Sequence, residues 1–185
     1  MPASLKLPLQ FDPALLARDL AAAEAYVKWI AHFNKGYYDG DWSGIPLRTT
    51  AGAHSPLYPD PTVNEYDNLP VLDQCPYFQH AVRSFECPIR TVRLLRLGGG
   101  AVIKEHRDYG LEYEEGEARV HIPVRTNPDV VFMLDGQRLV LAEGEAWYLN
   151  VNLPHSVRND GLADRVHLVI DCVVNDWLRE IFERE

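Results

Sequence analysis

The spacing of hydrophobic residues changes near residue 90 and divides the chain into two zones. In the first zone one apolar stripe recurs at intervals of three and four, which is the spacing of one helix face. Its members are Leu16, Leu20, Ala23, Val27 and Ile30. Asp12 is a suitable N-cap and Pro13 suits the first helical position, so the pattern predicts a helix that ends before Asn34.

The rest of the first zone is dominated by loop and turn residues. The segment from Gly36 to Pro70 is rich in Gly, Pro, Asp and Asn, and we expect a loop with one short strand at Ile45–Thr49. A loop of this length in a compact domain is usually either functional or misassigned, and one role for it is a lid over the site. A second helix is predicted to begin at Pro76 and to end before Pro88.

After Pro88 the period becomes two, which is the spacing of strands with one buried face. The predicted strands are Thr91–Leu97, Ala101–Arg107, Ala118–Arg125, Val130–Leu134, Arg138–Leu141, Glu145–Leu149, His155–Arg158 and Arg165–Val174. Eight short strands at close spacing predict a mostly β fold, either a jelly roll or a closed barrel. We expect a single domain over 1–185, with helices and loops over about 1–90, a β core over about 91–174 and a short helix over 175–184.

Composition and charge narrow the class of protein. Hydrophobic residues make up 46% of the chain and charged residues 24%, as in an ordinary soluble globular protein. The net charge of −9 argues against nucleic acid or a membrane as a partner, because both need a basic surface. The first residues lack the apolar core of a signal peptide, and no apolar run approaches a membrane span. Three cysteines without CxxC spacing favour a reducing cytoplasm, and nothing indicates the oligomeric state.

The same tripeptide occurs on two predicted strands, as Arg119-Val-His121 and Arg165-Val-His167. Alternation along a strand places the arginine and histidine side chains on one face and the apolar side chains on the other. Two readings of the polar face remain open: it lines the mouth of a barrel, or it faces solvent.

Three residues with metal-binding side chains occur in the second zone. His106 and Asp108 share one face at the end of a strand, and His155 begins a later strand after a proline. Two imidazoles and one carboxylate are the facial set that suits iron(II) oxygenases. Such a set leaves three positions open, two for a 2-oxo acid and one for dioxygen. Each piece alone is common, and a lone histidine such as His155 is more often structural.

One arginine after His155 is a candidate for binding the carboxylate of an oxo acid. Arg165 lies ten residues after His155 and begins another strand. A guanidinium can hold the distal carboxylate of 2-oxoglutarate through two parallel hydrogen bonds, which a lysine cannot do. The alternative is an arginine at a strand edge in water.

Taken in order, His106-x-Asp108, Arg119-x-His121, His155 and Arg165 resemble the aspartyl/asparaginyl β-hydroxylase family of 2-oxoglutarate oxygenases. The likeness is greatest to its small bacterial members that hydroxylate free amino acids, and it is strongest over about 91–171. It implies a cupin-like double-stranded β-helix with helices packed outside. It also implies a hydroxylase that uses iron(II), 2-oxoglutarate and O2, with His106, Asp108 and His155 as iron ligands. Arg165 would anchor the oxo acid, and Arg119 and His121 would contact it.

The resemblance has one departure, and it bears on the substrate. The peptidyl hydroxylases of the family carry a serine eleven residues before the first ligand histidine, where this chain has Leu95. Flanking arginines resemble those of the free amino-acid hydroxylases, so we expect a small-molecule substrate, without excluding a peptide. A free amino acid needs a cation for its carboxylate. The candidate substrate-binding residues are Arg93, Arg96, Arg48, Tyr109 and Trp42.

Two other functions fit part of the pattern. A cupin-type metalloprotein that is not an oxygenase, such as an isomerase or a sensor, would explain the metal residues and Asn159, but it would leave Arg165 without a role. A barrel that has lost turnover and serves as a binding module would not need the intact ligand set.

Overall fold

A computed structural model describes residues 2–52, 57, 59–60, 62–111 and 113–184. The strands are β1 (Ser4–Gln10), β2 (Ile30–Ala31), β3 (Tyr38–Asp39), β4 (Trp42–Thr50), β5 (Tyr66–Asn68), β6 (Ile89–Leu97), β7 (Val102–His106), β8 (Glu117–Arg125), β9 (Val130–Leu134), β10 (Gln137–Leu139), β11 (Glu145–Leu149), β12 (His155–Asn159) and β13 (Arg165–Val173). The helices are α1 (Pro13–Tyr26), α2 (Pro70–Asp73), α3 (Pro76–Arg83) and α4 (Asp176–Glu183), with short 3₁₀ turns at Lys35–Tyr37 and Tyr113–Glu115.

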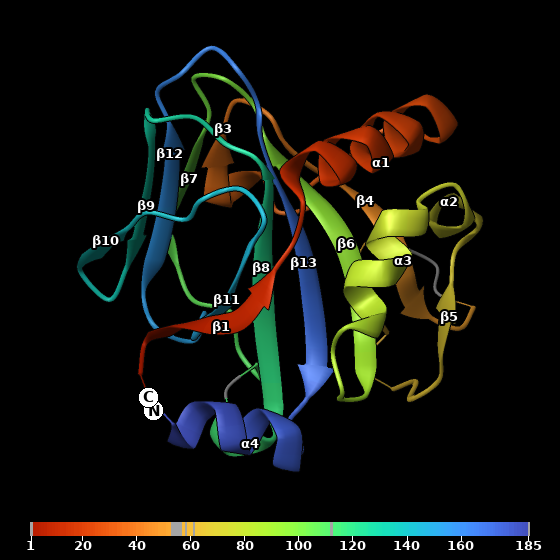
Figure 1. Ribbon diagram of the computed structural model, residues 1–185. Coiled ribbons are helices and arrows are strands. Elements are labelled where there is room, and N and C mark those ends of the chain that lie inside the picture. The colour runs from red at the N-terminus through yellow and green to blue at the C-terminus, as the bar shows by residue number, and fades with distance from the viewer. Residues whose placement is uncertain (1, 53–56, 58, 61, 112, 185) are drawn as a thin grey trace.

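Within this described part, the strands form two antiparallel sheets that face each other (Figure 1). The larger sheet runs in the order β1-β11-β8-β13-β6-β4-β2, with β5 paired to β4. The smaller sheet runs in the order β10-β9-β12-β7-β3. The fold is a double-stranded β-helix, as the resemblance implied. None of the described helices combines the length and the hydrophobicity that crossing a bilayer requires.

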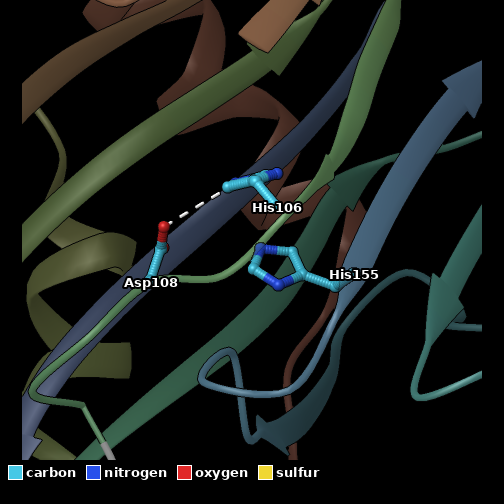
Figure 2. Close-up of side chains that lie close together, drawn as sticks. All are labelled: His106, Asp108 and His155. Atoms are coloured by element: carbon cyan, nitrogen blue, oxygen red, sulfur yellow. Dashed lines mark ion pairs between the residues drawn. The ribbon is translucent and has the colours of Figure 1, made fainter.

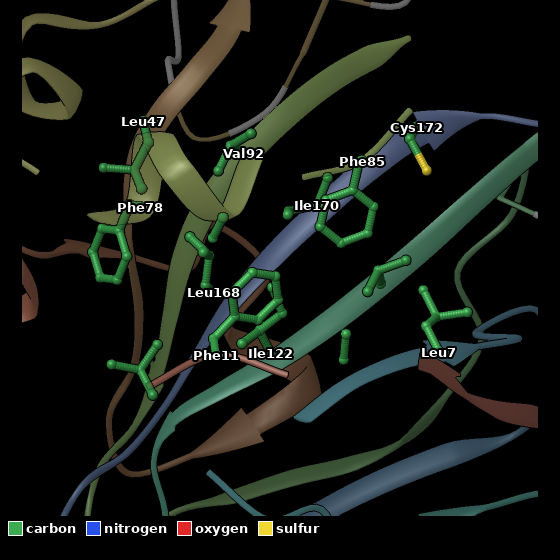
Figure 3. Close-up of a cluster of buried hydrophobic side chains, with 14 of the residues drawn as sticks. Leu7, Phe11, Leu47, Phe78, Phe85, Val92, Ile122, Leu168, Ile170 and Cys172 are labelled. Carbon is green, nitrogen blue, oxygen red and sulfur yellow. The ribbon is translucent and has the colours of Figure 1, made fainter. Parts of the chain in front are cut away.

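Two hydrophobic clusters hold the layers together. The first lies between the outer face of the larger sheet and the helices, and it includes Ile122, Leu168 and Phe78 (Figure 3). The second joins the inner faces of the two sheets and includes Leu97 and Phe132. Burying a large apolar side chain is worth about 1.5–3 kcal/mol, so the apolar alternation on β8 and β13 fixes which face of each strand is turned toward the helices.

The two readings of the Arg-x-His face are resolved by this packing. Because Val120 and Val166 belong to the cluster under the helices, the arginine and histidine side chains on the same strands point between the sheets. Arg119, His121 and Arg165 are all buried. The polar face therefore lines the inside of the β-helix rather than facing solvent.

All eight predicted strands are present, with boundaries that differ by at most a few residues. The second helix and the terminal helix are also confirmed, as α3 and α4. Asp135 and Gly136 both have positive φ, 49° and 74°, in the tight turn between β9 and β10. Glycine takes such a conformation without strain, and aspartate tolerates it, so this dipeptide closes the hairpin.

The first zone differs more from the prediction. The first helix ends at Tyr26, and Ile30 lies in the edge strand β2, so the last part of the apolar stripe belongs to a sheet. Within Gly36–Pro70, the nine-residue strand β4 replaces the short strand expected there, and residues 53–56, 58 and 61 lie outside the described part. Strand β1 was not expected, although its leucines alternate. Pairing with the β core decided these segments, because local spacing is weak in short strands that contain proline.

Candidate metal centre and oxo-acid site

The three candidate metal ligands meet at one end of the β-helix (Figure 2). His106 ends β7 and lies opposite His155 on β12, with their ring centroids 4.2 Å apart. Asp108 follows two residues after His106, and its backbone N–H donates to the carbonyl of Val151. Ligand atoms of all three side chains lie within 4.8 Å of one another. The predicted convergence of these residues is therefore present in the fold.

Backbone hydrogen bonds set the tautomer of both imidazoles. The Nδ1 atom of His106 lies 2.8 Å from the carbonyl oxygen of Lys104, and Nδ1 of His155 lies 3.0 Å from that of Leu153. A carbonyl oxygen can only accept, so each Nδ1 carries the proton and each Nε2 presents a lone pair. Metal-binding histidines are usually oriented in this way by a partner on the other ring nitrogen.

Charges around the site keep its ligands in the form that binds a cation. Burial by itself would raise the pKa of Asp108, but Arg119 and the neighbouring imidazoles outweigh it and lower that pKa. Burial, together with the charge of His106, lowers the pKa of His155 to about 4. Near neutral pH these two ligands are thus a carboxylate and a neutral imidazole, the forms that metal coordination needs.

Arg119 contacts the carboxylate of this site rather than standing free in the cavity. Its Nη1 donates to Oδ2 of Asp108 at 2.5 Å, and its Nε and Nη2 donate to Asp171 at 2.7 and 3.0 Å. Asp171 also accepts from Arg93, at 2.7 Å. The sequence prediction gave Arg119 a direct contact with the oxo acid, whereas in the structure its described partners are two carboxylates.

Arg165 is a buried cation that lacks a described counter-ion. It is 2% exposed, and no described carboxylate lies within ion-pair distance. Its Nη2 donates to Nδ1 of His167 at 2.8 Å, and its guanidinium lies 5.7 Å from the ring centroid of Phe132. Its Nε has no partner among the described residues. Burial lowers its pKa to about 9, so the charge is retained at neutral pH and the pocket is suited to an anion.

A chain of hydrogen bonds extends from Arg165 toward the metal residues. Nδ1 of His167 accepts from Arg165, so the Nδ1 of His121, 3.2 Å away, must carry the proton in their mutual hydrogen bond. The Nε2 atom of His121 is then a buried acceptor without a partner in the described chain. Burial and the charge of Arg165 hold the pKa of both histidines well below its usual value.

These depressed pKa values predict an acid-sensitive fold. Below pH 6.5 the unfolded chain protonates His121 and His167 while the folded chain does not, so stability is lost as the pH falls. The free energy of unfolding should drop by up to about 1.4 kcal/mol per pH unit for each histidine. Urea unfolding of the metal-free protein at pH 7 and pH 5 measures the effect. In the His121→Gln/His167→Gln variant the slope should shrink, and an unchanged slope would contradict the assignment.

A cavity of 570 Å³ adjoins the candidate metal centre. Its wall includes Arg93, Trp42 and Tyr109, three of the five residues predicted to contact substrate. Trp42 stacks on His32 with centroids 3.5 Å apart, and Tyr109 is 81% exposed at the rim. The volume is suited to a small molecule.

The other two predicted substrate residues do not line this cavity. Arg96 lies on the other face of β6, where it donates to Asp41 and stacks over Trp29. Arg48 on β4 donates to Asn68 and to the carbonyl of Ile89. Both side chains are engaged away from the cavity, so the structure does not bring these two residues to the candidate site.

Sequence reasoning missed several residues of the site. Asp171 was detectable, because it continues the alternation of Arg165 and His167 on β13 and so shares their inner face. His32 had no such signal, since it lies beside the edge strand β2, yet in the structure it lines the cavity and stacks on Trp42. Asn159 is fully buried and donates to the carbonyls of Leu97 and Gly98, so the structure gives it a role in loop packing rather than in a cupin metal motif.

Comparison with known proteins agrees with this geometry. The family model described as Aspartyl/Asparaginyl beta-hydroxylase matches residues 14–174. L-Proline cis-4-hydroxylase of Rhizobium meliloti (strain 1021) is 32% identical over 173 residues, which cover 88% of this chain. The match spans 58% of the length of that relative.

Solved structures with a similar fold are more distant in sequence. An oxidoreductase of the 2OG-Fe(II) oxygenase family from Burkholderia pseudomallei aligns with a TM-score of 0.57 and 19% identity, covering 94% of this chain and 88% of that one. A prolyl-4-hydroxylase from Pseudomonas putida aligns with a TM-score of 0.56 and 11% identity, covering 94% and 93%. At these identities the likeness establishes the fold only.

Proposed function

We propose that this chain, which belongs to the aspartyl/asparaginyl β-hydroxylase family, is a dioxygenase that uses iron(II) and 2-oxoglutarate to hydroxylate an unactivated C–H bond of an amino acid. One observation carries the proposal: two imidazoles and a carboxylate converge at one end of a β-helix whose interior holds a buried arginine without a described counter-ion. A metal and a dianion together complete this arrangement.

In this proposal His106, Asp108 and His155 hold the iron. Their two neutral Nε2 atoms and one carboxylate are the donor set of non-haem iron(II) oxygenases. When bound, the iron and the oxo acid supply the oxidising chemistry that protein side chains lack. The role of the chain is to hold the ligands, shield the site and place the substrate.

Arg165 is assigned to the distal carboxylate of 2-oxoglutarate. A buried guanidinium is stable only when an anion with good hydrogen-bond geometry joins it, and a carboxylate matches its planar fork. Strand register places His121 between the level of Arg119, which contacts Asp108, and the level of His167, which contacts Arg165. We therefore place the oxo acid along His121, with one end at the iron and the other at Arg165.

A free amino acid is the substrate class that the cavity fits best. Arg93 offers a cation beside the candidate metal centre, and Trp42 and Leu95 offer apolar surface. Glu117 at the same wall, which is ion-paired with Arg90, offers a carboxylate for an ammonium group. The net charge of −9 also favours a small molecule over nucleic acid. L-Proline is the first compound to test, since a relative is a proline hydroxylase. The three free, buried cysteines fit a reducing compartment such as the cytoplasm.

Replacing Arg93 should separate substrate binding from oxo-acid binding. Loss of a charged hydrogen bond to the substrate carboxylate is worth about 1.5–3 kcal/mol, so the KM for the amino acid should rise by roughly 10- to 100-fold in Arg93→Met. The KM for 2-oxoglutarate should change much less. Arg96→Met is the matched control, because Arg96 lies on the same strand but on the opposite face. Equal kinetic effects of both substitutions would contradict the assignment.

Succinate release tests the function as a whole. The protein is incubated anaerobically with iron(II) and 2-oxoglutarate, exposed to O2 and screened with free L-amino acids, beginning with proline, and with short peptides. We expect iron-dependent succinate in a one-to-one ratio with a hydroxylated product. If no substrate stimulates succinate release although iron(II) and the oxo acid bind, the oxygenase proposal fails and a binding role replaces it.

A further inference from the structure

Three adjacent strands place complementary polar side chains at one level inside the β-helix. Asp171 on β13 is paired in register with Arg119 on β8 and with Thr91 on β6. It is 4% exposed, and both of its oxygens accept hydrogen bonds. Oδ1 accepts from Nε of Arg119, while Oδ2 accepts from Thr91 at 2.7 Å, from Arg93 at 2.7 Å and from Nη2 of Arg119 at 3.0 Å.

The two arginines that donate to Asp171 extend to different parts of the site. Arg119 continues to the candidate metal ligand Asp108, whose Oδ2 it contacts at 2.5 Å. Arg93 lines the cavity beside that ligand. Arg93, Asp171, Arg119 and Asp108 therefore form an unbroken chain of ion pairs, with two positive and two negative charges, from the cavity wall to the metal centre.

Charge balance gives Asp171 a specific part in this chain. Without it, Arg119 would have Asp108 as its only described anion, and a guanidinium paired fully with a metal ligand competes with the metal for that carboxylate. With it, the charge of Arg119 is shared with a second carboxylate, and the four side chains of this chain of ion pairs together carry no net charge. The same carboxylate holds Arg93 at the cavity wall.

We propose that Asp171 is a positioning residue that tunes the metal centre and fixes the substrate-side arginine at the same time. It acts through Arg119 and Arg93, because its own oxygens are occupied by their donors. The inference rests on the proposed function for the identity of the metal and the substrate. The hydrogen-bond chain itself is a property of the fold.

The proposal predicts that replacing Asp171 changes the affinity for the metal cation and the affinity for the anionic oxo acid differently. Asp171→Asn keeps the shape of the side chain but removes one negative charge near the metal, leaving two arginines with one carboxylate. Binding of a divalent cation should weaken, while binding of the dianionic oxo acid should be unchanged or tighter. A general loss of structure would weaken both, so the contrast distinguishes a positioning role from a structural one.

The test measures binding without turnover. Co(II), and iron(II) under anaerobic conditions, are titrated into the intact chain of residues 1–185 while quenching of tryptophan fluorescence is followed, since the Trp42 ring lies 5.9 Å from the His106 ring. We expect the Kd for the metal to rise at least tenfold in Asp171→Asn, and the Kd for 2-oxoglutarate, measured in Co(II)-saturated protein, to stay within threefold of the parent value or to fall. Asp41→Asn is the control, because it removes a carboxylate from an exposed ion pair with Arg96. A metal Kd within twofold of the parent, or equal losses for metal and oxo acid, would overturn the proposal.

A milder variant keeps the test decisive if Asp171→Asn does not fold. Thr91→Val removes one hydrogen bond to Oδ2 and leaves every charge in place. We expect its metal Kd to rise two- to fivefold with the oxo-acid Kd unchanged, and no change in either would overturn the proposal. Parent protein that binds no metal would instead defeat the proposed function, so the two failures can be told apart.

Discussion

Asp108→Ala and His155→Ala are each expected to abolish iron(II) binding and to reduce turnover by roughly three orders of magnitude or more, because a bound metal supplies several kcal/mol of the catalytic effect. Each substitution removes one of three donors whose atoms lie within 4.8 Å of one another. Asp108→Ala also leaves Arg119 without one of its two carboxylate partners. Asp108→Ala should therefore weaken metal binding in two ways: it removes one donor, and it leaves a less compensated positive charge on Arg119 beside the site.

Metal binding and activity are measured separately to make this result interpretable. Anaerobic iron(II) titration reports the site itself, and succinate release reports turnover. His80→Ala is the matched control, since His80 is exposed on α3 and packs against Tyr77. Near-normal metal affinity in either ligand variant would remove that residue from the coordination set, whatever its proximity to the other two.

Arg165→Met is expected to raise the KM for 2-oxoglutarate by roughly 100-fold while the Kd for iron(II) changes less than threefold. The distal carboxylate would lose a charge-assisted pair in a buried site, which is worth about 3 kcal/mol. Arg165→Lys should recover only part of the loss, because an ammonium group cannot form the two parallel hydrogen bonds.

The same substitution is expected to stabilise the protein in the absence of the oxo acid. Arg165 is 2% exposed, has no described counter-ion and has a pKa lowered to about 9 by burial, all of which oppose folding. Replacing such a cation with an apolar side chain of similar volume typically gains about 1–4 kcal/mol. Urea unfolding with and without 2-oxoglutarate measures both effects. If Arg165→Met is less stable than the parent and keeps its oxo-acid affinity, Arg165 has a structural role instead.

Much of the β core could be predicted from the sequence alone. The alternation of Val120 and Ile122 with polar neighbours, and the Asp135-Gly136 turn, each express a local rule of strand or hairpin geometry. Local rules are satisfied within a few residues, so the sequence carries them without reference to the rest of the fold. In the same way, the order and spacing of the residues from His106 to Arg165 indicated the family to which the chain belongs.

What the sequence could not supply is which polar side chains on the inner face contact one another. Arg119 and Arg165 occupy the same place in identical tripeptides, yet one is paired with two carboxylates and the other has no described anion. Arg93 and Arg96 differ in role because strand alternation and sheet packing turn one inward and the other outward. Such partners are set by strand register across residues far apart in the chain, for example Asp171 opposite Arg119, and a shift of one residue would exchange every one of them.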